Sequence, residues 1–475
     1  MSERKLDLIA VGGGTAGLVT AAGGAGLGAR VALVERDRLG GECLWNGCVP
    51  SKALIAAARA AHDARTASRL GIHAVDVRVA FDEVLDHVRR VQARIAPHDS
   101  PERFRGLGVH VVEGTARFVD AGTIQVGDER LTARHIVIAT GTRPAVPPIP
   151  GLADVPFLTN ETIFSISTLP RTLLVLGGGP IGTELAQAFA RLGSVVYVVE
   201  ALPDFFPRED RELAVMLQQQ LEGEGVTLML NSTATAVRRE GEDIVLAVTR
   251  DGVSHDVRGD ALLVAVGRRP NVEGLGLDEI GVRTDKGGVI TDGALRTTVN
   301  GVYAAGDIVS GGLKFTHVAD HMARSVLRNA LFPGSSTVEY SGVPWVTYTD
   351  PELAHVGLTE SEARERYGSG VGVWRRELAG VDRVIADAGP AGLVKIITDP
   401  KGRVIGGHIL GPHAGDMIGE LTMAVTLKLS VGQIASVIHP YPTTAEAIRQ
   451  ASEQRRKAGF TGWKKSLVTW LVQHV

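Results

Sequence analysis

Apolar runs and a glycine-rich turn alternate at the start of the chain in the order strand, turn, helix, strand. Residues 6–11, which are apolar except for Asp7, predict a short buried strand, and an Ala/Leu/Val-rich stretch of helical length follows the turn. The next predicted strand, residues 30–34, ends at Glu35, 23 residues beyond the first glycine of the turn. The glycines of the turn are Gly12, Gly14 and Gly17. Such glycines permit a tight turn, close approach of the backbone to a pyrophosphate and close helix packing, so the pattern predicts a dinucleotide site with Glu35 binding a ribose.

The same pattern occurs a second time. Residues 172–176 predict a strand, a helix follows through Glu184, and a strand at residues 195–199 ends at Glu200, again 23 residues beyond the first glycine. The glycines of this turn are Gly177, Gly179 and Gly182. One glycine turn is weak evidence, but two copies with strand, helix and terminal acid in register predict two nucleotide sites.

Two matching strand ends indicate how these units are connected. The strand at residues 135–138 leads into a proline cluster at residues 144–150, which marks a domain boundary. A matching strand and turn, which includes Gly267, spans residues 262–270 after the second unit. We therefore expect a second nucleotide domain inserted into the first. The first domain resumes at residues 302–307, where Asp307 either binds a sugar hydroxyl or serves as a strand-end turn residue.

The chain changes character from about residue 341. Predicted strands at residues 393–397 and 404–409 are interspersed with apolar-periodic helices around residues 422–429 and 445–455, without a glycine turn. The predicted fold class is α/β, with two Rossmann-like dinucleotide-binding domains, one inserted in the other, and a C-terminal α+β domain. The predicted boundaries are 1–148 and 269–338 for the first domain, 149–268 for the second, 339–455 for the third and 456–475 for a C-terminal extension.

Composition and charge narrow the classes of function. The 475 residues carry 50 Lys and Arg against 53 Asp and Glu, a net charge of −3, and no long basic run, which excludes nucleic acid as a first choice of partner. Residues 8–29 are uncharged and could pass for an export signal or membrane span, but eight of them are glycine, which weakens a helix. We therefore expect a cytoplasmic protein.

The two cysteines of the chain, Cys43 and Cys48, follow the first nucleotide unit directly. A zinc site usually needs four ligands, and no second pair exists. Inert packing thiols and a redox disulfide stay open at this point. A helix predicted to begin near Ser51 would favour a thiolate, because helix N-termini lower thiol pKa values.

The order of these motifs, with the run Cys-x4-Cys-Val-Pro-Ser-Lys from Cys43 to Lys52, resembles the pyridine nucleotide-disulfide oxidoreductases over residues 4 to about 455. The resemblance implies a homodimer with an active site shared across the interface, FAD at the first turn and NAD(H) at the second. The implied FAD site comprises Gly12, Gly14, Gly17, Glu35, Lys52, Gly114, Asp307, Lys314, Phe315, Thr316 and His317. The implied nicotinamide site comprises Gly177, Gly179, Gly182, Glu184, Glu200 and Gly267.

The resemblance also implies roles for four side chains. Lys52 and Glu184 match the family's ion pair beside the flavin ring. Cys48 would face the flavin and Cys43 would exchange with the substrate. A hydride would then pass from nicotinamide through flavin to the disulfide and on to a small-molecule, disulfide or metal-ion acceptor. Glu200 favours NADH over NADPH, because a carboxylate repels a 2′-phosphate.

The chain departs from lipoamide dehydrogenases and glutathione reductases near its C-terminus. Their His-Pro-Thr-x-x-Glu pattern, which supplies the acid/base histidine, reads Tyr441-Pro-Thr-Thr-Ala-Glu446 in this chain. A phenol titrates near 10, so Tyr441 is a poor base at neutral pH. His439 is an alternative candidate for the role.

The sequence is similar to the mercuric reductases and their relatives at Tyr441 and in residues 185–193 and 205–210. The chain lacks the vicinal C-terminal cysteines that pass the metal ion inward in that family. We therefore favour an FAD enzyme that uses NADH to reduce a small disulfide, metal ion or similar acceptor. The alternatives are a dihydrolipoamide dehydrogenase, a flavoprotein docking component of a multienzyme complex, and a diaphorase with a vestigial disulfide.

The last twenty residues lie beyond the resemblance. Apolar positions recur at roughly helical spacing in residues 460–471. We expect a helix that caps its own subunit or the dimer. A basic amphipathic helix that rests on a membrane or a partner is the alternative.

Overall fold

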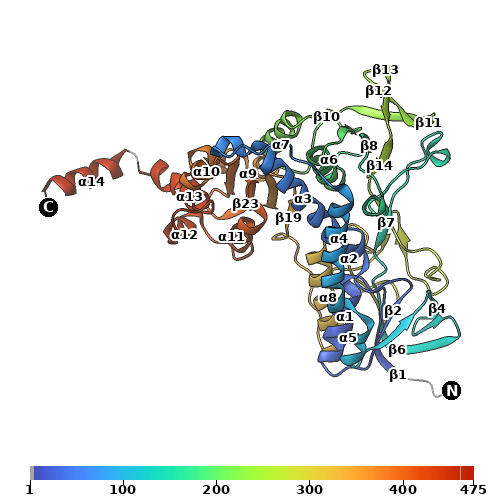
Figure 1. Ribbon diagram of the computed structural model, residues 1–475. Helices are drawn as coiled ribbons and strands as arrows, with labels where there is room; N and C mark the ends of the chain where they lie inside the picture. The colour runs from blue at the N-terminus through green and yellow to red at the C-terminus, as the bar shows by residue number, and fades with distance from the viewer. Residues whose placement is uncertain (1–4, 461, 475) are drawn as a thin grey trace.

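The computed structural model describes residues 5–460 and 462–474. Three domains are arranged as an elongated body, with the first nucleotide domain at one end, the second above it and the C-terminal domain to the side (Figure 1). The predicted α/β class and the insertion of one nucleotide domain into the other are both confirmed.

The first domain is built on a seven-stranded sheet in the order β3-β2-β1-β6-β5-β4, with β18 paired to β6. Its core strands are parallel, and β5 and β4 form an antiparallel edge. The strands are β1 (Lys5–Val11), β2 (Val31–Glu35), β3 (His110–Glu113), β4 (Ala116–Asp120), β5 (Thr123–Val126), β6 (Glu129–Ile138) and β18 (Val302–Ala304). The helices of this part are α1 (Thr15–Gly26), α2 (Gly41–Trp45), α3 (Cys48–Thr66), α4 (Phe81–Ile95), α5 (Pro101–Gly106) and α8 (Thr316–Leu331).

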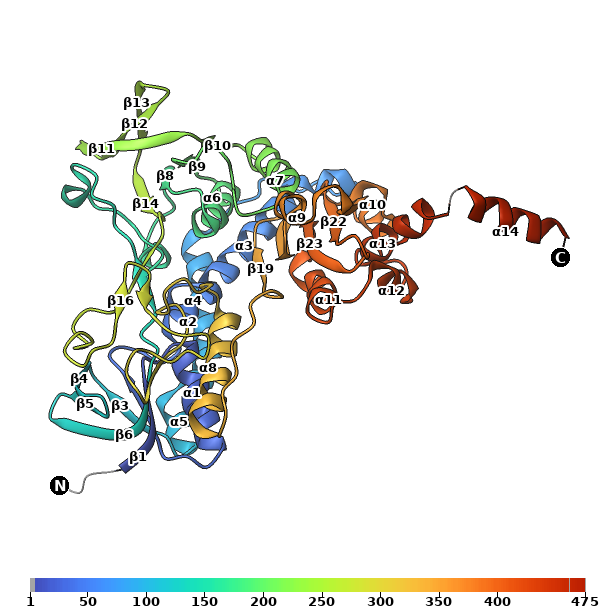
Figure 2. The ribbon, with the colours of Figure 1, turned by 180° about the vertical axis from the view of Figure 1, so that it is seen from behind.

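The second domain has a four-stranded parallel sheet in the order β10-β9-β8-β14. A three-stranded antiparallel sheet, β11-β12-β13, lies at its outer end (Figure 2). The elements are β8 (Thr172–Leu176), α6 (Pro180–Leu192), β9 (Val195–Val199), α7 (Arg211–Gly223), β10 (Val226–Met229), β11 (Ser232–Glu240), β12 (Asp243–Arg250), β13 (Val253–Gly259) and β14 (Ala261–Val264). The two connections to the first domain, β7 (Thr142–Pro144) and β15 (Arg268–Pro270), pair with each other.

The third domain is a five-stranded antiparallel sheet in the order β19-β20-β23-β22-β21, with helices packed on it. Its elements are β19 (Pro344–Thr347), β20 (Glu352–Gly357), α9 (Glu360–Tyr367), β21 (Gly372–Glu377), α10 (Asp382–Ala386), β22 (Leu393–Thr398), β23 (Val404–Gly411), α11 (Ala414–Thr426), α12 (Val431–Ser436) and α13 (Glu446–Ala458). A shared apolar core joins the domains, because buried residues of α3, α4, α6, α7 and this sheet pack together. The buried Lys395 on β22 reinforces the joint through ion pairs with Asp210 at 2.8 Å and Glu360 at 2.7 Å.

Some sequence-based boundaries were wrong. The helix expected near Ser51 begins at Cys48, because the first-turn N–H groups of a helix have no intrahelical acceptor and Pro50 is tolerated there. Helix α11 begins at Ala414, eight residues before the predicted region.

The C-terminal extension forms helix α14 (Trp463–His474), which projects away from the third domain in both views (Figures 1 and 2). The residues of α14 whose burial the structure describes are all exposed. The helix therefore does not cap its own subunit, which was one half of the expectation, and a cap on the dimer stays a prediction. Among the described residues, no helix is long and apolar enough to cross a membrane.

Candidate active site

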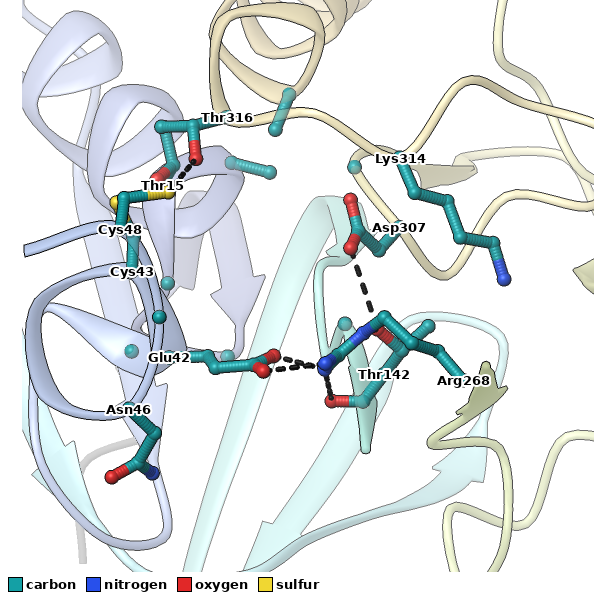
Figure 3. A pocket seen from close by; sticks show the side chains of 18 of the residues that line it. Thr15, Glu42, Cys43, Asn46, Cys48, Thr142, Arg268, Asp307, Lys314 and Thr316 are labelled. Carbon is teal, nitrogen blue, oxygen red and sulfur yellow. Dashed lines mark hydrogen bonds and ion pairs between the residues drawn. The ribbon is translucent and has the colours of Figure 1, made fainter. Parts of the chain in front are cut away.

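A cavity of about 1390 Å³ opens where the first domain meets α6 and the third domain. It is lined by the first glycine turn, both cysteines and the residues that follow β6 and β18 (Figure 3). The start of α6 and residues of β19 complete its wall. The cavity therefore joins the first nucleotide turn to the cysteine pair.

The first glycine turn has the close contacts that its sequence demands. A Cβ on Gly17 would lie 1.7 Å from the carbonyl oxygen of Gly12, so helix α1 can approach the turn only with glycine there. A Cβ on Gly14 would meet no atom within 4 Å, which leaves open space at the helix N-terminus. Glu35 accepts a hydrogen bond from the Gly13 N–H at 2.5 Å and another from the Asp37 N–H at 2.8 Å. This open N-terminus with a carboxylate at its side fits the pyrophosphate and ribose of a dinucleotide.

The second turn repeats this geometry. A Cβ on Gly182 would lie 2.1 Å from the Gly177 carbonyl oxygen, and a Cβ on Gly179 would meet nothing within 4 Å. Glu200 accepts from the N–H groups of Gly178 at 2.7 Å and Leu202 at 2.9 Å. The glycines of this turn, with Glu200 and Gly267, do not line the cavity of the first turn, whereas Glu184 does.

The cysteines lie on two consecutive helices. Cys43 is in the short helix α2 and Cys48 is the first residue of α3. Two left-handed glycines, Gly40 (φ 97°) and Gly41 (φ 56°), turn the chain against the first glycine turn. Both sulfurs are free thiols in the structure, and the Cys48 Sγ lies 3.8 Å from the Thr316 hydroxyl (Figure 3).

The two thiols differ in acidity. The hydrogen bond from Cys43 and the charge of Lys52 lower the pKa of Cys48 to about 6, against the cost of burial. The same hydrogen bond, together with burial, raises the pKa of Cys43. These shifts favour the thiolate at Cys48 and the thiol at Cys43 in the reduced pair.

Lys52 is held next to the cysteines by a partly buried ion pair. Its Nζ lies 2.8 Å from Glu184 on α6 and 4.4 Å above the ring of Tyr348. Glu184 also accepts from the Tyr348 N–H at 2.9 Å. Three domains thus fix one ammonium group beside Cys48.

A charged network on the opposite wall was not foreseen from the sequence. Arg268, on the connection back from the second domain, binds both carboxylate oxygens of Glu42, the residue before Cys43 (Figure 3). Asn160 donates to Glu42 at 2.5 Å, and Arg268 donates to Thr142 at 2.7 Å. Burial raises the pKa of Glu42 against the effect of Arg268. The sequence held one sign of this network, a carboxylate between a glycine turn and a cysteine. A buried carboxylate needs a partner.

The remaining predicted FAD-site residues lie around the same cavity. Asp307 accepts from the Thr142 hydroxyl at 3.3 Å, and burial raises its pKa. The Gly114 N–H donates to the Glu35 carbonyl at 2.7 Å. The cavity-lining members of this set are Gly12, Gly14, Glu35, Lys52, Gly114, Asp307, Lys314, Phe315, Thr316 and His317.

Tyr441, His439 and Glu446 do not line the cavity of their own chain. Tyr441 is 69% exposed and its hydroxyl donates to Asp382 at 2.8 Å, a bond that raises the pKa of Tyr441. The His439 side chain is 6% exposed and its Nε2 lies 3.1 Å from Glu420. Glu446 pairs with Arg449 at 2.6 Å. The acid bonded to Tyr441 is therefore Asp382, which the sequence reasoning missed.

Residues 6–323 match the family of pyridine nucleotide-disulphide oxidoreductases, and residues 343–452 match the dimerisation domain of that family. The chain belongs to this family. The family depends on FAD and uses NAD(P)H, so this protein is a flavoprotein oxidoreductase, and its dimerisation domain supports a homodimer.

Individual relatives of this oxidoreductase fall into two groups. A mercuric reductase from Streptomyces lividans is 37% identical over 457 residues, which cover 94% of this chain and 95% of that one. A dihydrolipoyl dehydrogenase from Haloarcula marismortui is 36% identical, covering 95% of this chain and 96% of that one.

Solved structures of the family agree with the fold. The Cu(II) complex of the HOCl-induced flavoprotein disulfide reductase RclA from Escherichia coli has a TM-score of 0.86 at 27% identity, covering 95% of this chain and 99% of that one. LpdA from Mycobacterium tuberculosis has a TM-score of 0.86 at 28% identity, covering 95% of this chain and all of that one. Within residues 5–460 and 462–474, no group of three or more His, Cys, Asp or Glu side chains forms a metal site.

Proposed function

We propose that this oxidoreductase uses NADH to reduce an acceptor that takes no proton from the protein, such as a metal ion or a quinone. The single observation that carries the proposal is Tyr441, with its raised pKa, at the position of the family's acid/base histidine. FAD supplies the two-electron chemistry between nicotinamide and disulfide when bound. The open space at Gly14 and the carboxylate of Glu35 support binding of FAD at the first turn.

Cys43 and Cys48 are proposed as the redox pair. Their disulfide takes up two electrons and one proton to give the Cys48 thiolate and the Cys43 thiol. Lys52 stabilises the thiolate through its charge. Oxidation by the acceptor re-forms the disulfide, delivers two electrons and releases the proton of Cys43 to solvent.

The acceptor is argued from the proton balance. Exchange with lipoamide requires a base of near-neutral pKa beside the interchange sulfur, which we assign to Cys43. We infer that Tyr441 of the partner subunit faces Cys43, and a phenol that already donates to Asp382 does not accept this proton at pH 7. Mercuric reductase among the relatives and the Cu(II) complex of RclA support a metal ion as acceptor.

An acceptor screen tests the proposal. The pure holoenzyme with NADH is expected to reduce mercuric or cupric ions or quinones well, and lipoamide and glutathione disulfide poorly. Tyr441→His should raise lipoamide reduction, and Tyr441→Phe should leave it low. Substantial wild-type lipoamide turnover that is abolished in His439→Ala and unchanged in Tyr441→Phe would show that His439 is the base and would overturn the proposal.

A further inference from the structure

The C-terminal end of the chain carries a charge opposite in sign to the molecule as a whole. After Glu453 the sequence has no Asp or Glu and has five basic residues, whereas the complete chain has a net charge of −3. The basic residues are Arg455, Arg456, Lys457, Lys464 and Lys465. The positive charge is therefore concentrated around α14. The family match ends at residue 452, before all of these residues.

Helix α14 also exposes an apolar face. Leu467, Trp470 and Leu471 are 47%, 55% and 41% exposed, and their spacing of three and four residues places them on one side of the helix. Thr469 and Gln473, also four residues apart, lie on the side away from these three residues, next to Val468 and Val472. The helix leads away from the third domain, so this face is not turned onto the body of its own subunit (Figure 1).

We propose that α14 and the basic residues before it form a docking surface for an anionic lipid bilayer. A basic helix that carries tryptophan and leucine on one face binds in the plane of the membrane interface, with its apolar face among the acyl chains and its lysines at the headgroups. The 12 residues of α14 span about 18 Å at 1.5 Å per residue, too short for the hydrocarbon core. The helix therefore lies on the membrane and does not cross it.

Charge favours lipid over a second copy of the chain as the occupant. Two copies of α14 packed face to face would bring two basic segments together, and like charges repel. Anionic headgroups neutralise the same charges, each Lys or Arg strengthening binding by about fivefold near such a surface. This docking surface does not depend on the identity of the electron acceptor.

Sedimentation of the full-length holoenzyme with vesicles tests the proposal. Binding is expected to vesicles of phosphatidylcholine with phosphatidylglycerol, to be at least about tenfold weaker to pure phosphatidylcholine, and to fall with added salt. Leu467→Glu/Leu471→Glu should weaken binding by about a hundredfold or more, because two leucines leave the membrane. The matched variant Thr469→Glu/Gln473→Glu adds the same charge at the same spacing on the opposite face. This variant should lose only the electrostatic part of its vesicle binding, which is smaller than the loss caused by removing the two leucines.

Light scattering on the same proteins distinguishes a lipid bilayer from a second copy of the chain as the occupant of this docking surface. NADH oxidation and the dimeric mass are expected to be unchanged in both double variants, because α14 lies outside the active site and the dimerisation domain. Equal loss of vesicle binding in the two variants would overturn the proposal, since no face would then be inserted. Absence of vesicle binding would also overturn the proposal. Dissociation of the dimer in Leu467→Glu/Leu471→Glu alone would show that α14 packs on a second copy of the chain.

Discussion

In the first glycine turn the Gly13 N–H donates to Glu35 at 2.5 Å, and in the second the Gly178 N–H donates to Glu200 at 2.7 Å. Each carboxylate uses its other oxygen to accept from the N–H two residues further on. Each helix can approach its turn only because a glycine, Gly17 or Gly182, lies against a carbonyl oxygen. The two nucleotide units therefore share one local construction.

The surroundings of the two turns differ. The chain leaves Glu35 and places Cys43 and Cys48 at the mouth of the first cavity. After Glu200 it forms the loop that carries Arg208, whose guanidinium lies 5.7 Å over the ring of Trp345. The same motif thus becomes a redox centre only where the next segment brings thiols to it. Glu184 on α6, through Lys52, links the second unit to that centre.

The largest expected difference between the two units comes from replacing the close-contact glycine of one turn at a time with alanine. Gly17→Ala places a Cβ 1.7 Å from a carbonyl oxygen and is expected to abolish FAD binding and lower Tm. Gly182→Ala, with its clash of 2.1 Å, should keep the flavin absorbance and raise KM for NADH by about tenfold or more. Flavin content and steady-state kinetics measure both effects.

Gly14→Ala is the control for these variants, because its Cβ would meet nothing within 4 Å of the protein itself. The apoprotein of Gly14→Ala should keep the wild-type Tm and lose only affinity for FAD, since the space taken is that of the cofactor. If Gly17→Ala bound FAD normally, the first turn would not be the flavin site.

The next effect tests which of the two cysteines is the thiolate that faces the flavin. Reduction of the wild type by NADH or dithionite is expected to give a long-wavelength thiolate-to-flavin absorbance band. Cys48→Ser should lose this band, and Cys43→Ser should keep it, because Cys48 is the thiolate of the pair. A band that persists in Cys48→Ser would reverse the assignment of the two sulfurs.

The sequence was sufficient for the parts of this site that depend on local spacing. Both turns and their terminal carboxylates follow from residues within about 30 positions of one another, and the structure has them as expected. The helix expected to begin near Ser51 begins three residues earlier, at Cys48, because Pro50 is tolerated within the first helical turn. Local rules leave such choices open.

Contacts between distant segments could not be predicted in the same way. Arg268 lies 226 positions from Glu42, and Asp382 lies 59 positions from Tyr441. Such partners depend on how the domains pack. In each pair the sequence drew attention to one residue at most, and it gave no sign of the partner. Lys52 and Glu184 are also far apart in the sequence, by 132 positions, and their pairing was anticipated only through the family resemblance.

A smaller effect is expected from the carboxylate of the second turn. Glu200 repels a 2′-phosphate and Arg208 is occupied over Trp345, so kcat/KM should favour NADH over NADPH. Glu200→Gln should narrow this preference by about tenfold, mostly through a lower KM for NADPH. Glu35→Gln in the first turn is the control and should leave the nicotinamide preference unchanged. A clear NADPH preference of the wild type would contradict the role given to Glu200.

The smallest effect concerns the charge that connects the two units. The pKa of Cys48 is lowered to about 6, so the thiolate and its absorbance band should be complete at neutral pH and disappear as the pH falls through about 6. The Lys52 charge is one cause of this lowering, so Lys52→Met should move the midpoint upward by about one pH unit. Lys314→Met is the matched control. Lys314 lines the same cavity, but its charge is not one of the principal causes of the lowered pKa of Cys48. Equal shifts in the two variants would mean that the ammonium groups act through the general field of the cavity, and that the Lys52–Glu184 pair does not tune the thiolate.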